Sequence, residues 1–253
     1  MTAQEFSNEF DILYNNVSSN AAPGLNEYEK SVVLTKAEIE YCRNIFNPKG
    51  NKYGEGFDGS PKRQIDFHKL TTIANPTEIT TNLNNYTKFD KRGVLYQLPQ
   101  NIMYIINETA TITYDTDHTH EINITPITFD ELSLYKSRPY KQPYKYQGWR
   151  LLGIDTTNGN TISEIIVKTG ATISDYAIRY IRFPKPIILF DLSTVTDYTE
   201  TFGGLTILGE TQQQTCELDE SVHPEILQRA VEIAKSTAIG DIQSLLTIGG
   251  RSE

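Results

Sequence analysis

The apolar positions of the chain have a helical spacing at both ends and a strand-like spacing in the middle. Near the start they recur every three or four residues, at Phe6, Phe10, Leu13 and Val17. Near the end a similar spacing returns, at Leu227, Ala230, Val231, Ala234 and Ala238. Such a spacing places apolar side chains on one face of an α-helix. We therefore expect a helix close to each end of the chain.

Capping signals predict where these helices begin. A Ser, Thr, Asp or Asn followed three residues later by Glu can hydrogen-bond the free amides of a first helical turn. This pattern occurs at Thr2 with Glu5 and at Asn26 with Glu29. It predicts one helix after each pair, and the second helix extends to about Phe46.

Proline marks two further helix starts. Ser60-Pro61 pairs an N-cap residue with proline at the first helical position, which predicts a short helix to about Leu70. The C-terminal helix is expected to begin at Ser221 or His223, with Pro224 in its first turn. Glycine is frequent in residues 47–60, so an irregular loop is expected there.

Residues 71–215 are rich in Thr, Ile and Tyr, which favour β-strands. Residues 115–117 and 157–160 have the composition of hairpin turns, the second with an Asn-Gly pair. The expected strands are 94–98, 102–106, 109–114, 118–124, 149–154, 162–168, 176–183, 187–191 and 205–208.

The order of elements is thus helix, sheet, helix. The simplest packing is an α+β fold in which the N- and C-terminal helices form a helical bundle and an antiparallel β-rich domain is inserted. The predicted domains are residues 1–70 plus 216–253 for the helical body and residues 71–215 for the insertion. Separate helical and β domains along the chain are the alternative.

Composition narrows the possible functions. The formal net charge is −9, whereas a dedicated nucleic-acid binder usually carries a basic excess. The two cysteines, Cys42 and Cys216, are far apart and form no CxxC pair, so two buried free thiols are expected, with a single long-range disulfide as the alternative. The first residues lack the basic segment and the apolar segment of a secretory signal peptide. A membrane helix needs roughly 20 apolar residues, and the apolar runs here are far shorter.

One cluster contains residue types that ligate metals. His118 and His120 lie two residues apart, so on a strand they point to the same side, with Asp115 and Asp117 close in sequence. Ile122 would share that face, which favours histidines at the wet end of a half-buried strand. The alternative is a metal-dependent hydrolase. The sequence contains no GxSxG, Walker or GxGxxG motif, and we predict no catalytic residue, no metal site and no cofactor.

Residues 133–150 are basic and aromatic and contain no acidic residue. Such a composition can bind a phosphate backbone and stack bases, which leaves a DNA-binding accessory protein as an alternative. It also suits a protein contact anchored by Tyr, Trp and Arg, which is the favoured interpretation. The interface candidates, including one from the loop 47–60, are Phe57, Arg138, Tyr140, Trp149 and Arg150.

Several segments together resemble the ring-forming head-to-tail connector proteins of crAss-like, podovirus-type bacteriophages. The resemblance depends on the order and number of the segments, among them Arg138-Pro139-Tyr140, Trp149-Arg150 and Cys216-Glu217-Leu218. Residues 71–124 match poorly. The similar segments are 5–16, 23–37, 57–70, 125–131, 138–143, 149–150, 176–189 and 216–231.

The resemblance implies a non-enzymatic structural protein of the virion. It implies a dodecameric ring of identical subunits at the head–tail junction, in contact with the portal protein and with other tail ring or nozzle proteins. Double-stranded DNA would pass through the lumen without sequence-specific binding, and no membrane would be involved. Assembly would take place in the host cytoplasm. Another virion component, such as a tail-tube or collar protein, is the nearest alternative.

Overall fold

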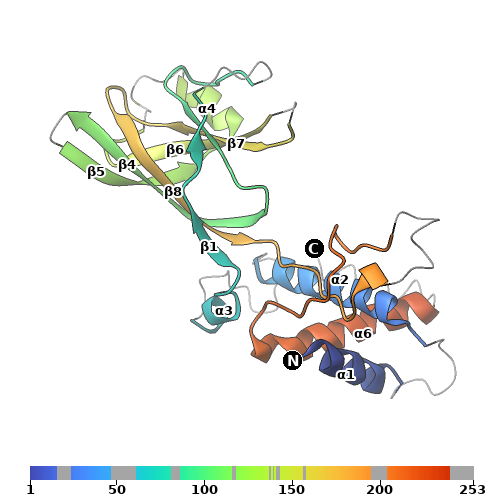
Figure 1. Cartoon of the computed structure of the whole chain (residues 1–253). Coiled ribbons are helices and arrows are strands. Elements are labelled where there is room, and N and C mark those ends of the chain that lie inside the picture. The colour runs from blue at the N-terminus through green and yellow to red at the C-terminus, as the bar shows by residue number, and fades with distance from the viewer. Residues whose placement is uncertain are drawn as a thin grey trace. The chain divides into compact units, whose positions relative to one another are not determined.

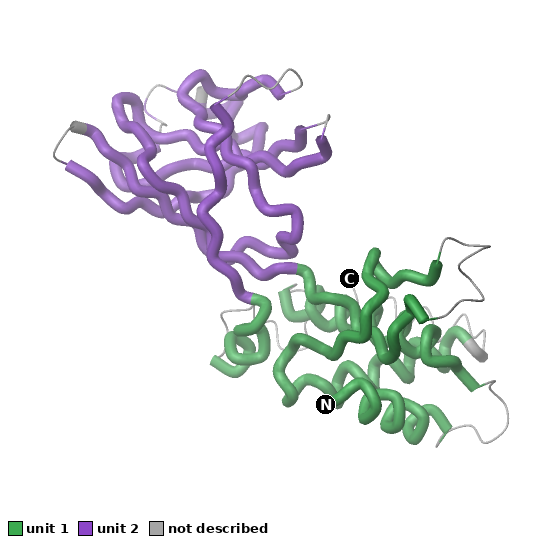
Figure 2. The backbone as a smooth tube through the Cα atoms, in the orientation of Figure 1, with its two compact units in different colours: residues 1–70, 183–253 green, residues 71–182 purple. Residues whose placement is uncertain are grey.

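The chain forms two compact units, one helical and one built on a β-sheet. The helical unit comprises residues 1–70 and 183–253, and the sheet unit comprises residues 71–182 (Figures 1 and 2). The fold is therefore α+β, as expected. The computed structural model describes residues 1–15, 24–46, 61–80, 86–115, 118–136, 138, 140, 143–155, 158–194 and 204–239.

The helical unit contains helices from both ends of the chain. The predicted capping boxes are present, since the Thr2 amide donates to Glu5 at 2.7 Å and the Asn26 amide donates to Glu29 at 2.9 Å. The second helix runs without interruption to Phe46. The α-helices are α1 (Ala3–Asn15), α2 (Glu27–Phe46), α3 (Pro61–Asp66) and α6 (His223–Ile239), with short 3-10 helices η2 (Leu192–Thr194) and η4 (Glu220–Val222).

Helix α6 contacts both α1 and α2. The buried face of α1 consists of Ala3, Phe6, Phe10 and Tyr14. Leu13 is 40% exposed, so the expectation that it shares the buried face is wrong. Tyr14 takes its place because it continues the spacing of four residues set by Phe6 and Phe10. That the helices form a bundle stays a prediction.

The sheet unit has eight strands in the order β1-β8-β4-β5-β6-β7-β3-β2. The pairing of β5 with β6 is parallel, so the prediction of an antiparallel sheet is wrong at this one junction. A parallel pair needs a long crossover, which residues 127–146 supply with helix α4 (Phe129–Lys136). The strands are β1 (Thr71–Ala74), β2 (Thr77–Glu78), β3 (Val94–Gln97), β4 (Ile102–Asp115), β5 (His118–Pro126), β6 (Gln147–Ile154), β7 (Thr161–Ile166) and β8 (Thr172–Arg182).

Strands β1 and β2 lie at opposite edges of the sheet, although only residues 75 and 76 separate them along the chain. The sheet must therefore curl until its two edges come close together. The residues that are buried together in the core of this unit come mainly from β4, β5 and β8. They are Tyr96, Leu98, Ala110, Ile112, Ile122, Ile124, Ile165, Val167, Tyr176, Ile178 and Tyr180.

The prediction of strands at 187–191 and 205–208 is wrong. Each forms only one isolated bridge, Ile188 with Gln214 and Ile207 with Glu210. The amide of Leu189 instead donates to the Ser31 hydroxyl on α2 at 3.0 Å, so this segment is bound to a helix. Residues 183–215 belong to the helical unit, whereas the predicted β-rich domain extends to residue 215.

Among the described residues, no helix combines the length and the apolar character needed to cross a membrane.

Candidate functional site

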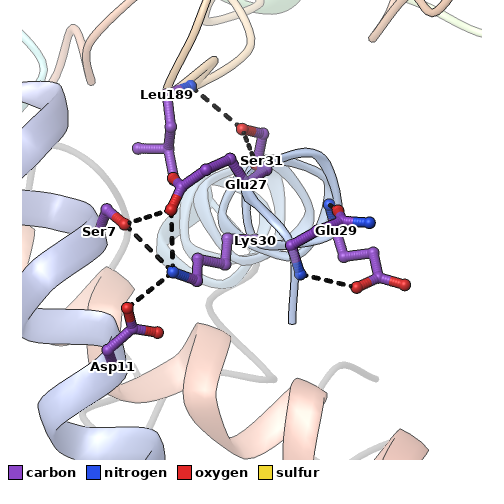
Figure 3. Close-up of polar contacts among 8 residues, drawn as sticks. Ser7, Asp11, Glu27, Glu29, Lys30, Ser31 and Leu189 are labelled. Carbon is purple, nitrogen blue, oxygen red and sulfur yellow. Dashed lines mark hydrogen bonds and ion pairs between the residues drawn. The ribbon is translucent and has the colours of Figure 1, made fainter. Parts of the chain in front are cut away.

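In the helical unit, the ammonium group of Lys30 joins α2 to α1 (Figure 3). It donates to Asp11 at 2.7 Å, to Glu27 at 3.0 Å and to the Ser7 hydroxyl at 3.2 Å. Burial alone would lower the pKa of Lys30, but the hydrogen bonds to Asp11 and Glu27 outweigh burial and raise that pKa. Lys30 is therefore a permanent cation that holds the two helices in a defined register.

A second buried polar cluster in the helical unit surrounds Glu38. Its side chain is fully buried and accepts a hydrogen bond from the Cys216 thiol at 3.1 Å. Burial raises the pKa of Glu38 to about 8. Burial also raises the pKa of Cys42 and of Cys216, and both are free, as expected. At neutral pH these thiols are protonated, so neither is suited to act as a nucleophile.

The core of the sheet unit contains a polar network around Glu108. Tyr176 donates to Glu108 at 2.5 Å, and the Nε atom of Arg150 lies 3.2 Å from the other oxygen of the same carboxylate. Ser163 lies 3.3 Å from the Tyr176 hydroxyl. Burial raises the pKa of Glu108, although Arg150 and Tyr176 oppose this effect. The network is a buried ion pair whose carboxylate also accepts from Tyr176.

Two predicted interface residues, Trp149 and Arg150, are more than nine-tenths buried. Because successive side chains of a strand point to opposite faces, they lie on opposite sides of β6. Trp149 packs with Leu132 of α4, and its ring lies 5.1 Å from that of Tyr135. Both residues thus have partners within the subunit, and an interface role for them stays a prediction.

Arg138 and Tyr140 belong to the same basic and aromatic segment. Tyr140 is 99% exposed, and Arg138 is also exposed. Phe57 lies outside the described residues. The basic and aromatic segment is not one loop, since its first residues belong to α4 and its last residues belong to β6. In its middle part the Lys145 ammonium lies 5.5 Å from the centre of the exposed Tyr146 ring.

The two histidines of β5 lie as expected at the wet end of a half-buried face. His118 is exposed, while Ile122 and Ile124 farther along the same face are buried. The His120 ring packs against that of Tyr146, with their centres 5.4 Å apart. No group of three or more metal-ligating side chains occurs among the described residues, which include neither Asp117 nor the side chain of Asp115.

Sequence reasoning missed Glu108 and helix α4, although the sequence contains a signal for each. Glu108 alternates with Ala110 and Ile112 along β4, which predicts that it faces the core. Helix α4 starts at a capping box, in which the Thr128 amide donates to Glu131 at 2.8 Å. Lys30 gave no comparable signal, because its burial depends on contacts with α1.

Comparisons with known proteins cover both units. A family model described as "Phage tail ring protein 3/4" matches residues 1–242. "Ring protein 4/5" of Bacteroides phage crAss001 is 49% identical over 254 residues, which span all of both chains. "Ring protein 3" of the same phage is 30% identical over 237 residues, which cover 92% of this chain and 95% of the relative.

Proposed function

Because this chain belongs to the phage tail ring protein 3/4 family, we propose that copies of it assemble into a ring at the head–tail junction. The ring joins the portal protein to the next tail ring and encloses the channel for DNA. Family membership confirms the resemblance to ring proteins of crAss-like phages, and these are structural proteins rather than enzymes. The single observation that carries the proposal is a relative named as a ring protein that aligns over the full length.

Exposed apolar side chains support the assembly of many copies. Large apolar residues are exposed on both units, and on a lone subunit they would remain in contact with water. Closing a ring requires two different surface patches on each subunit that fit each other. The exposed set includes Ile12 and Ile65 in the helical unit, and Ile73, Phe89, Phe129 and Ile154 in the sheet unit.

The acidic balance of the chain fits a channel through which DNA slides. With a net charge of −9, a ring of many copies is strongly negative. Carboxylates that face the lumen would repel phosphates and keep the wall from binding the duplex. If acidic side chains lie only on the outside of the assembled ring, this part of the proposal is wrong.

The test is the native mass of the purified protein, alone and mixed with its cognate portal protein. We expect a ring, or a portal complex that contains a fixed multiple of 28.7 kDa, and a dodecamer in either case. A chain that stays monomeric in both samples would contradict the proposal. Association only with tail components other than the portal would move the ring to another position in the tail.

A further inference from the structure

Helix α1 has an outward face that is both apolar and acidic. Ile12 and Leu13, in its last turn, are 63% and 40% exposed. Glu9 precedes them by one turn and Glu5 by two turns on the same side of the helix, and both are exposed. Residues 3–15 contain three acidic side chains and neither lysine nor arginine. This surface, the α1 face, therefore presents large apolar side chains beside negative charge.

Helix α3 and the turn after it have an outward face of the same kind with the opposite charge. Ile65 is 58% exposed. Lys62 precedes it by three residues and Lys69 follows it by four, and both lysines are exposed. Asp219 lies near enough to Lys69 to offset part of its charge, while Asp66 of α3 is buried. The surface around Ile65, the α3 face, is therefore apolar and positive.

The α3 face is held in place from within its own subunit. The ring of Phe67 is fully buried and lies 6.2 Å from the ring of Tyr41 and 5.4 Å from that of Phe46, both on α2. Asp66 accepts a hydrogen bond of 3.0 Å from the Ser221 hydroxyl. These contacts fix the inner side of the segment. A partner that binds the outer side does not have to order it, which lowers the cost of association.

The two faces complement each other in both charge and polarity. Their apolar side chains can leave water together, and their opposite charges orient the approach. Two copies of the same face would repel each other, so the contact joins different patches, as a closed ring requires. Helix α3 and the last turn of α1 lie on opposite sides of the helical unit (Figure 1). One subunit can therefore contact one neighbour through each face.

We propose that the α1 face of one copy packs against the α3 face of the next copy in the ring. Ile12 and Leu13 cover Ile65, and Glu9 pairs with a lysine. Because Lys62 and Lys69 flank Ile65, Glu9 meets the first if the two helices run parallel and the second if they run antiparallel. This inference rests on the proposed ring, and it adds which parts of the chain meet.

Charge reversal tests the pairing. One variant is Glu9→Lys, and the other combines Lys62→Glu with Lys69→Glu. Each alone should need roughly tenfold more protein than the wild type to form rings, because like charges meet at every contact. A mixture of the two should form rings at the wild-type concentration, since an even-numbered ring can alternate them so that opposite charges meet throughout. Native mass measures assembly, with the portal present if the wild type requires it.

The matched control for charge is Lys36→Glu. Lys36 is an exposed lysine of α2 that belongs to neither face. This variant should assemble as the wild type does. Glu9→Lys combined with Lys36→Glu restores the net charge but should assemble as poorly as Glu9→Lys. The triple variant Glu9→Lys, Lys62→Glu and Lys69→Glu should instead assemble on its own.

A neutral variant separates assembly from folding. Ile12→Ser keeps every charge, and because Ile12 is 63% exposed the melting temperature should stay within about 2 °C of the wild type. Ring assembly should again need roughly tenfold more protein, since an apolar contact is lost. Ile73→Ser is the matched control, because Ile73 is 69% exposed but belongs to the sheet unit. Its assembly should be unchanged.

The outcomes distinguish this inference from the proposed function. Wild-type rings, together with normal assembly of either charge-reversed variant, would overturn the contact and leave the ring function standing. Folded variants that fail alone and also fail when mixed would overturn it as well. If a charge-reversed chain does not fold, normal assembly of Ile12→Ser would overturn the contact. A wild-type chain that forms no ring with or without the portal would overturn both.

Discussion

The two units bury charge in different ways. In the helical unit Lys30 is buried, but its partners Asp11 and Glu27 keep 47% and 44% of their side-chain surface exposed. In the sheet unit the side chains of Arg150 and Glu108 keep only 10% and 3% of their surface exposed. Removing one member of a pair is most costly when the remaining charge has no access to water. We therefore expect the sheet unit to depend more strongly on its ion pair than the helical unit does.

The largest effect is expected for Glu108→Leu, which leaves the Arg150 cation buried without a counter-charge. We expect a loss of about 3–5 kcal/mol in the free energy of unfolding. Trp149 is the only tryptophan in the chain and lies in the sheet unit, so its fluorescence in urea follows this unit. The double variant Glu108→Leu with Arg150→Met should recover most of the loss. A loss of less than about 1 kcal/mol for the single variant would contradict the comparison.

A loss of stability of the same size is expected at Trp149 itself. Trp149→Ala should cost about 3–5 kcal/mol, because it leaves a cavity beside Leu132 and Tyr135. Thermal unfolding followed by circular dichroism measures this loss without the fluorescent residue. Tyr140→Ala is the control, since Tyr140 is 99% exposed and its replacement should change stability by less than about 0.5 kcal/mol. Normal stability with failed assembly would instead assign Trp149 to an interface.

In the helical unit, Glu38 should make stability depend on pH. The pKa of Glu38 is raised from 4.5 in the unfolded chain to about 8 in the folded chain. Between these values the unfolded chain binds fewer protons at this site, so the contribution of Glu38 to stability falls as the pH rises. Glu38→Gln cannot ionise and should be more stable than the wild type at pH 8 by about 2–4 kcal/mol.

Urea unfolding at pH 5 and pH 8, followed by helical circular dichroism, measures this difference. The difference in the free energy of unfolding between Glu38→Gln and the wild type should increase toward pH 8. An equal gap at both values would mean that Glu38 is ionised in the folded chain throughout this range.

The smallest loss of stability is expected for Lys30→Met. The carboxylates of Asp11 and Glu27 are half exposed and stay hydrated after the cation is removed. The loss should be about 1–2 kcal/mol in urea unfolding. Lys36→Met changes an exposed lysine of the same helix and should have almost no effect. A loss for Lys30→Met as large as that for Glu108→Leu would remove the distinction between the two units.

Local signals predict the helix starts correctly, because a capping box depends on residues three positions apart, whereas the helix predicted to reach Leu70 ends at Asp66. The Asn158-Gly159 signal was also reliable, and Gly159 has the φ of +68° that such a turn needs. The prediction of a strand at 187–191 is wrong because of contacts with a distant part of the chain. Its apolar composition suits a strand, yet Ser31 and Thr35 of α2 bind the amides of Leu189 and Ile187. Nothing within the segment itself carries that information.

Chemical type alone does not distinguish a surface residue from a core residue. Trp149 and Arg150 are of types that often anchor a partner, and the structure gives both residues partners within the subunit. Alternation along β6 predicts that they face opposite ways, but not that both faces of this strand are covered. That coverage comes from α4 on one side and from the curled sheet on the other.

The chain enters the sheet unit through β1 and leaves it through β8, and these two strands are hydrogen-bonded to each other, Thr71 opposite Ile181. The ends of the inserted segment therefore meet within one strand spacing. From the standpoint of the helical unit, the whole insertion is equivalent to a single long hairpin, which costs little in loop-closure entropy whatever its length. An insertion of this kind can be lengthened, shortened or exchanged while the helices stay the same. The inserted residues can thus differ among relatives of this chain while the paired strands β1 and β8 are kept.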